Sequence, residues 1–237
     1  MGRSLDMELD RRLRLLERLY ALHDHFTADL DALACGLHCD TCCTRNVTMT
    51  TLEGRYLLDG LSSPERRRLL EGVRVQADRP RYRPAITTNT LARMCIEGRE
   101  PPEERPPDEP AHCPLLEEKA CPVYDRRPFG CRCFVSRQRC GDHGYADVDE
   151  WVLTANTVFL QTIEQLDCTG CFGNFSDVLL ALNNWGITAA ESLPAQDCEA
   201  AGLLANQPTR ALMIPPEHME RVQPLLQAIR ALAADAG

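Results

Sequence analysis

The sequence lacks an apolar run long enough to cross a membrane. Its longest uncharged and largely apolar stretch, residues 151–163, is shorter than the roughly 20 residues that a bilayer requires, and it contains Thr, Asn and Gln. The first twenty residues are charged from position 3 onward and have no apolar core, so no secretory signal is predicted. We therefore expect a cytoplasmic protein that contacts no membrane and keeps its thiols reduced.

The sequence also lacks an excess of positive charge. Its 26 Lys and Arg residues face 35 Asp and Glu residues, for a formal net charge of −9. This balance argues against a protein that coats nucleic acid, so we expect no nucleic-acid partner. With 237 residues, of which 44% are hydrophobic and 26% charged, the chain is typical of a soluble globular protein, and we expect a single domain over residues 1–237.

Apolar residues recur at helical spacing through most of the chain, which predicts a mainly α fold with at most one small β-hairpin. A long amphipathic helix is expected over residues 5–34, a cysteine-rich metal-binding region over 35–140 and a helical C-terminal region over 141–237. Further helices are expected from Thr51, from Ser63, and over 88–97, 150–167, 177–185 and 216–235, with an extended connector over 99–110 and the hairpin around Glu117–Ala120.

The chain is rich in cysteine, with 13 residues, and four of them fall within nine positions: Cys35, Cys39, Cys42 and Cys43. Thiolates this close can converge on one metal centre without closing a long loop. Because adjacent side chains on an extended backbone point in opposite directions, Cys42 and Cys43 could serve two different centres. An odd number of cysteines in a reducing compartment disfavours a disulfide framework, so metal binding is the leading interpretation.

A second group of cysteines follows later in the chain, and two of them stand in Cys-Pro steps, which also accompany iron–sulfur ligation. A C-x2-C pair comes after it, a spacing that suits zinc and iron clusters equally. The eleven clustered cysteines could supply one or two four-ligand centres, and Cys95 and Cys198 are expected in the core. The later ligand candidates are Cys113, Cys121, Cys131, Cys133 and Cys140, followed by Cys168 and Cys171.

Arginines crowd the second group and could offset the negative charge of a thiolate-bound metal, hold an anionic ligand or form a solvated basic face. The histidines near cysteines are interpreted as polar loop residues, with ligation as the alternative, and His23 as a residue at the edge of the core. No acid–base or nucleophilic constellation is evident, so we assign no catalytic residue. The arginines are Arg126, Arg127, Arg132, Arg137 and Arg139, and the histidines are His38, His112 and His143.

Two blocks of the chain resemble the YkgJ-type cysteine-cluster family, described as zinc- or iron-chelating domains. The family's C-x2-C-x2-C-C block corresponds to Cys39-Asp-Thr-Cys42-Cys43, with Cys35 one residue further upstream than that pattern expects. Its second block corresponds to Cys113-Pro-Leu-Leu, Cys121-Pro-Val-Tyr-Asp-Arg-Arg127-Pro and Cys131-Arg-Cys-Phe134. The resemblance covers about residues 35–134 and implies a metal or iron–sulfur centre built from both blocks, while it implies little about a reaction.

Two further hypotheses compete with an iron–sulfur protein: a methyl-transfer enzyme that uses S-adenosylmethionine, and a module held together by zinc. Cys35-x3-Cys39-x2-Cys42 matches the three-cysteine motif of radical S-adenosylmethionine enzymes, but those enzymes place it after a barrel strand. Flagellin lysine methylases carry a similar cysteine cluster, so methyl transfer is a second hypothesis. A third is a structural or interaction module held together by zinc. We favour an iron–sulfur protein, of the [4Fe–4S] type and with one or two centres, acting in redox or anaerobic modification chemistry; zinc is the alternative metal.

Overall fold

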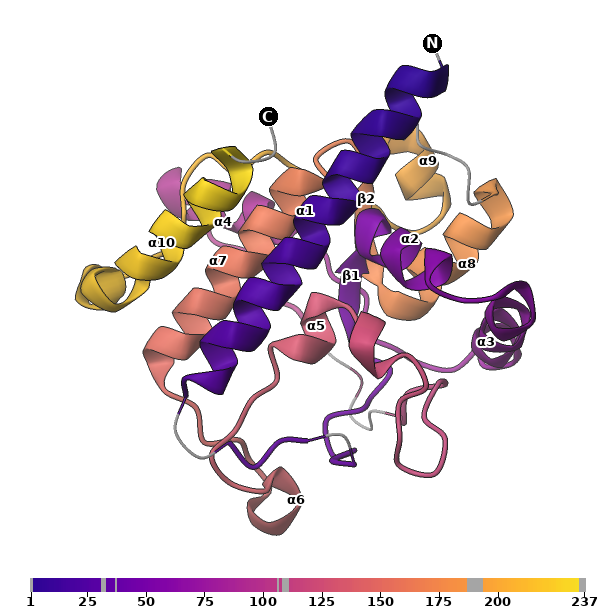
Figure 1. Ribbon diagram of the computed structural model, residues 1–237, viewed down its shortest axis with the longest axis horizontal. Helices are drawn as coiled ribbons and strands as arrows, with labels where there is room; N and C mark the ends of the chain where they lie inside the picture. The colour runs from indigo at the N-terminus through magenta and orange to yellow at the C-terminus, as the bar shows by residue number, and fades with distance from the viewer. Residues whose placement is uncertain are drawn as a thin grey trace.

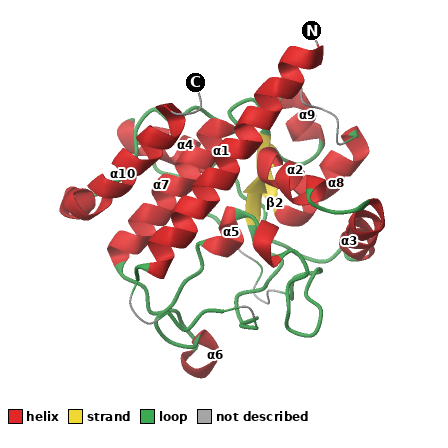
Figure 2. Cartoon of the chain, viewed as in Figure 1, coloured by secondary structure: helices red, strands yellow, loops and turns green. Residues whose placement is uncertain are grey.

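The computed structural model describes residues 2–30, 33–36, 38–105, 107, 111–186 and 194–234 (Figure 1). Within them the chain is mainly helical, with one small sheet (Figure 2). The elements are α1 (Gly2–Ala28), β1 (Thr48–Thr50), α2 (Thr51–Asp59), α3 (Ser63–Val75), α4 (Thr88–Ile96), η1 (Tyr124–Arg126), α5 (Phe129–Arg132), α6 (Cys140–His143), α7 (Glu150–Leu166), β2 (Cys171–Asn174), α8 (Phe175–Trp185), α9 (Ala195–Ala200), β3 (Leu204–Ala205), η2 (Pro216–His218) and α10 (Met219–Ala234).

The helices form two groups on either side of the sheet. Helices α1, α7 and α10 pack against one another, and α2 and α3 pack against α8 (Figure 1). Below them in this view, the chain between α1 and β1 and the chain from α5 to α7 run mostly as loops (Figure 2). The molecule therefore has a helical body and, at one end of it, a loop-rich region that contains most of the cysteines.

Each helical group encloses its own apolar cluster. The first is built on α2, α3 and α8, where Leu57, Leu58 and Val178 are fully buried. The second lies between α1, α5 and α7, where Phe129 and Phe159 stack at 5.3 Å between ring centroids. Burial of a large side chain contributes about 1.5–3 kcal/mol, so these clusters are the main source of the body's stability.

The sheet joins three segments that are far apart in sequence, in the order β1-β2-β3 and antiparallel throughout. Met49 faces Gly173, and Phe172 faces Leu204. A Cβ on Gly173 would lie 2.5 Å from the Cδ2 of Leu203, so glycine at this position leaves room for the Leu203 side chain to pack on the central strand.

The expectation of a mainly α fold is confirmed, as are the helices expected near residues 51, 63, 88–97, 150–167, 177–185 and 216–235. Three details differ. The first helix ends at Ala28, short of residue 34; α3 has Ser62 as its N-cap in place of Ser63; and the 113–124 hairpin is reduced to one bridge between Glu117 and Ala120. The described part of the 99–110 connector has no regular structure, as expected.

None of the helices in the described part of the chain is both long and apolar enough to pass through a membrane.

Candidate metal centre

A cavity of about 220 Å³ lies in the loop-rich region, and seven of the residues that line it are cysteines. Its walls come from the end of α1, the first cysteine block and the second cysteine block, segments up to about a hundred residues apart in the sequence. The cysteines that line it are Cys35, Cys39, Cys42, Cys43, Cys113, Cys121 and Cys131. The first cysteine block therefore faces the second across one space, as the sequence led us to expect.

Turns fold the first block tightly. The amide of Cys39 donates to the carbonyl of Gly36 at 3.0 Å, and the amide of Cys43 donates to the carbonyl of Asp40 at 2.9 Å. The amide of Ala34 is held by the carbonyl of Ser136 at 2.8 Å. These local bonds satisfy the backbone without helix or strand and leave the four thiols of the block on the cavity wall.

Backbone pairing attaches the first block to the second. The amide of Cys113 donates to the carbonyl of Cys43 at 2.9 Å, and Thr44 forms an isolated antiparallel bridge with His112. On the next residue, the amide of Arg45 donates to the carbonyl of Ala111 at 2.9 Å. Cys43 and Cys113, seventy residues apart, are in this way fixed beside each other.

Glu53 positions the short helix that carries Cys131. Its Oε1 accepts the amide of Phe129, the first residue of α5, at 2.7 Å, and the hydroxyl of Tyr20 at 2.8 Å. Its Oε2 accepts the amide of Thr50 at 2.8 Å. A buried carboxylate costs free energy unless several donors satisfy it, and Glu53 meets that need while joining α1, α2 and α5. Burial still raises its pKa above the ordinary value.

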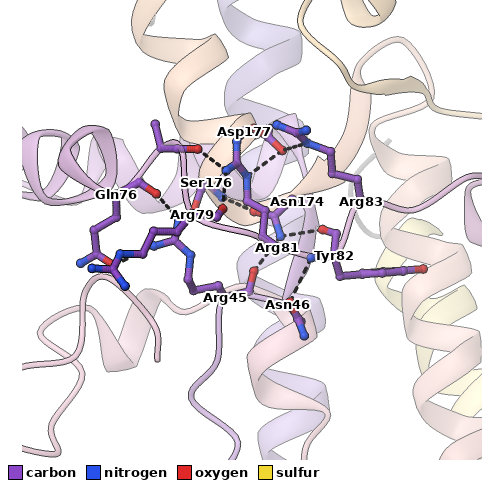
Figure 3. Close-up of polar contacts among 11 residues, drawn as sticks. Arg45, Asn46, Gln76, Arg79, Arg81, Tyr82, Arg83, Asn174, Ser176 and Asp177 are labelled. Carbon is purple, nitrogen blue, oxygen red and sulfur yellow. Dashed lines mark hydrogen bonds and ion pairs between the residues drawn. The ribbon is translucent and has the colours of Figure 1, made fainter. Parts of the chain in front are cut away.

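Arginine contacts anchor the other end of the first block, as Figure 3 shows. The buried Arg45 donates to the side-chain oxygen of Gln76 at 2.7 Å, and Asn174 donates to the carbonyl of Arg45 at 2.7 Å. Nearby, Arg81 and Arg83 both pair with Asp177 at the start of α8. The block is thus held between the end of α3 and the start of α8, so the helical body fixes where the cysteine loop leaves it.

The cavity thiols form two sets of electrostatic neighbours. In the first set, burial raises the pKa of Cys131 well above the ordinary value, and the thiols of Cys113 and Cys121 raise it further. The pKa of Cys43 is lowered, because Cys42 donates a hydrogen bond to its sulfur. The thiols of Cys113, Cys121 and Cys131 work against this effect and raise the pKa of Cys43. The first set is therefore Cys43, Cys113, Cys121 and Cys131.

The second set surrounds Cys35. Burial is the main cause that raises the pKa of Cys35, and the thiols of Cys39, Cys42 and Cys140 add to it. The hydrogen bond to Cys43, followed by burial, raises the pKa of Cys42. That bond joins the two sets directly, so the assignment of Cys42 and Cys43 to two different centres stays a prediction. Cys140 starts α6, beside the first block.

Two arginines of the second block face this cavity. Arg132 is almost fully buried and forms a two-pronged ion pair with Asp24 of α1, with both oxygens 3.0 Å from its Nη1. Arg127 lies with its guanidinium 3.7 Å from the ring centroid of Tyr124. The positive charge of Arg127 lowers the pKa values of Cys42, Cys121 and Cys131, although burial of these thiols outweighs it. The other three arginines singled out in the sequence, Arg126, Arg137 and Arg139, are outside the described cavity lining.

Other candidate residues lie elsewhere. The thiol of Cys133 donates to the carbonyl of Gly130 at 3.6 Å and packs against the second apolar cluster, and burial raises its pKa to about 12. The side chains of His38, His112 and His143 are exposed. His23 is buried, 1% exposed, and lies 3.2 Å from Asn156 with aromatic neighbours, so it is a core residue at the cavity wall.

The C-x2-C pair is a correction. Cys171 is bonded to Cys198 in a disulfide and is buried in β2, whereas Cys168 is an exposed free thiol at the end of α7. The reason is that α9 packs beside the sheet and brings Cys198 within 5.7 Å of Cys171 between Cα atoms, which suits a disulfide. Cys168 and Cys171 therefore do not form a ligand pair, and the expectation that all thiols stay reduced is wrong for Cys171 and Cys198. Cys198 is a core residue, as expected, whereas the expectation that Cys95 lies in the core is wrong, because its side chain is exposed on α4.

The donors that line the cavity are thiols, which are ligands of both zinc and iron–sulfur clusters. Among the described residues, no three Cys, His, Asp or Glu side chains are placed so that they could hold one metal ion. The seven thiols instead surround a cavity that far exceeds the roughly 10–15 Å³ needed for one water molecule. A cluster spreads its ligands around several metal atoms, so it needs such a space and suits sulfur donors.

Neither Glu53 nor Asp24 was singled out from the sequence. Glu53 had a local signal, the Thr-x-x-Glu capping box with Thr50, but its bond to Phe129 and the bond of Asp24 to Arg132 join residues 76 and 108 positions apart. No protein-family model matches the chain, and comparisons with curated proteins and with solved structures also give no match.

Proposed function

We propose that the protein binds an iron–sulfur cluster of the [4Fe–4S] type in the thiol-lined cavity and acts in redox or anaerobic modification chemistry. The observation that carries the proposal is the convergence of seven cysteines, from both blocks, on one cavity. Cys113, Cys121 and Cys131 also pack against the first apolar cluster, whereas Cys35, Cys39, Cys42 and Cys43 line the cavity without belonging to either cluster.

Cys43, Cys113, Cys121 and Cys131 are the proposed ligands of one centre, since they form one electrostatic set and backbone bonds join Cys43 to Cys113. Cys35, Cys39, Cys42 and Cys140 would hold a second centre. When bound, such a cluster supplies one-electron transfer. The protein's own contribution is to bring the donors together and to offset negative charge with Arg127.

The test is anaerobic purification followed by a visible spectrum, with iron, acid-labile sulfide and zinc measured on the same sample. The proposal expects broad visible absorption and equal amounts of iron and sulfide. Colourless protein with stoichiometric zinc would reject it and support the zinc-held module, whose ligands are the same thiols.

Single substitutions test the ligand assignment. Cys39→Ser and Cys42→Ser should each lower bound metal and stability together, because metal binding and folding of this region are coupled. Cys95→Ser is the matched control, because Cys95 is an exposed free thiol on α4. Metal content that is unchanged in both Cys39→Ser and Cys42→Ser would refute the assigned site.

A further inference from the structure

We propose that Arg127 sets the reduction potential of the centre as its built-in positive counter-charge. This inference rests on the proposed function. It assigns to Arg127 a tuning role, through electrostatics, and no contact with a substrate. It also separates Arg127 from the other arginines of the cysteine region.

The guanidinium of Arg127 is held at the cavity wall. It stacks on the ring of Tyr124, 3.7 Å from the centroid, and its Nη1 donates to the carbonyl of Tyr124 at 2.7 Å. Both partners are neutral, so they fix the position of the side chain and leave its charge intact. Arg127 lies between Cys121 and Cys131 in the chain, and its positive charge lowers the pKa of both thiols.

The charge of Arg127 is not cancelled locally. In the described part of the chain, no carboxylate forms an ion pair with Arg127, whereas Arg132, on the same cavity, is paired with Asp24. The charge of Arg127 also lowers the pKa of Cys42 in the first block, so its electrostatic influence reaches thiols of both blocks. It is therefore the cavity's arginine whose full positive charge remains to act on whatever the thiols bind.

An uncancelled cation beside a cluster favours the reduced state. Reduction by one electron makes a thiolate-bound cluster more negative, and the attraction to a nearby guanidinium grows accordingly. Net charge and hydrogen bonding around the sulfurs are known determinants of cluster potential. Removing the charge should thus make the cluster harder to reduce.

The experiment is an anaerobic redox titration of the purified holoprotein, with dithionite as the one-electron reductant and the visible spectrum as readout. Arg127→Gln should shift the midpoint potential downward by about 59 mV or more, the equivalent of a tenfold change in a one-electron equilibrium. Arg127→Lys retains a charge on a more flexible stem and should shift it less.

Arg126→Gln is the matched control. Arg126 stacks on Tyr56 at 4.8 Å and donates to the carbonyl of Tyr56 at 3.1 Å, which is the same type of contact, but it is outside the described cavity lining. Its substitution should leave the potential unchanged. If Arg127→Gln fails to retain the cluster, Arg127→Met and Arg127→Lys are compared: a lower potential in the Met variant supports the inference, and equal potentials overturn it.

The two proposals fail in different ways. A wild-type protein without iron and sulfide rejects the cluster itself. A wild-type protein with a full cluster, together with a fully loaded Arg127→Gln variant that titrates at the wild-type potential, rejects only the role of Arg127.

Discussion

The helical body and the cysteine region are built on different principles. In the body, long helices bury complete apolar faces, and its polar groups meet one another in closed networks such as the one around Glu53. The cysteine region is made up of residues 33–47 and 111–149, and the elements in its described part, η1, α5 and α6, are short (Figure 2). Its thiols surround a cavity. We expect the body to hold its shape through its own packing, and the cysteine region, which is fixed at its ends, to depend on what fills its centre.

The largest expected effect concerns removal of the metal. Residues 38–47 and 111–133 should lose most of their protection against hydrogen exchange when the cluster is removed anaerobically, because turns and single bridges are their described backbone contacts. Helices α7 and α8 should stay protected. Mass spectrometry of exchanged, protease-digested protein measures both in one experiment. Equal loss in both regions would mean that the body also depends on the metal.

A cavity created in the body should lower the free energy of unfolding whether or not metal is bound. Phe159→Ala removes a fully buried ring that stacks on Phe129, and should lower the free energy of unfolding by about 3–5 kcal/mol with or without metal. Leu153→Ala on the same helix is the control, because Leu153 is 52% exposed. Urea unfolding of the metal-free proteins measures both. A loss seen only in the metal-bound protein would contradict the independence of the body.

The body should have its own sensitivity to acid. Burial lowers the pKa of His23 from 6.5 to about 4, so the protein gains stability from the neutral ring above pH 6.5 and loses it as the pH falls through about 4. The loss amounts to about 3 kcal/mol. His23→Gln should remove this part of the acid sensitivity in metal-free protein, measured by urea unfolding at several pH values.

Leu153→Ala, which changes an exposed side chain that does not titrate, provides the control for this experiment and should leave the pH dependence unchanged. Asp167 has the opposite effect on stability between pH 3.8 and about 6, because burial raises its pKa to about 6. Its neutral form stabilises the fold below pH 3.8, and that contribution is lost as the pH rises through about 6. A His23→Gln variant with the same acid slope as the wild type would show that the ring does not stay neutral in the fold.

A smaller effect is expected where the two regions meet. Thr50 caps α2, and its hydroxyl and amide both bond Glu53, which in turn holds the amide of Phe129. Thr50→Ala should cost about 1 kcal/mol in the free energy of unfolding. Ser62→Ala, in the exposed capping box of α3, offers a comparison outside this network. Only Thr50→Ala should also weaken metal retention, and equal retention would argue against Glu53 as the positioning group.

The sequence predicted the longer helices because each of them carries a complete local signal, whereas α5, α6 and α9, of four to six residues, were not predicted. In α7, for example, Ala155, Phe159 and Ile163 recur at helical spacing and are all buried. The sheet had no such signal, since its strands are two to four residues long and β1 pairs with β2 across more than a hundred positions. The Cys171–Cys198 disulfide was missed for a related reason, because only the packing of α9 on the sheet brings the two residues together.

The thiol cavity was partly predictable. The density of cysteines located both blocks, and the adjacency of Cys42 and Cys43 suggested two sets of donors. What assigns individual thiols to the cavity is long-range backbone pairing, such as that of Cys43 with Cys113, and the placement of α5 by Glu53. Cys133 shows the limit of spacing arguments, because a two-residue step from Cys131 turns its side chain into the apolar cluster.

The most direct measurement compares iron and acid-labile sulfide per chain in two variants purified anaerobically side by side. Cys131→Ser removes a thiol at the centre of the first set, and Cys95→Ser removes an exposed free thiol on the body. We predict that Cys131→Ser loses iron and sulfide together, whereas Cys95→Ser retains the wild-type content of both. Iron and sulfide at the wild-type level in Cys131→Ser, or an equal loss in the two variants, would contradict a cluster held in the thiol-lined cavity.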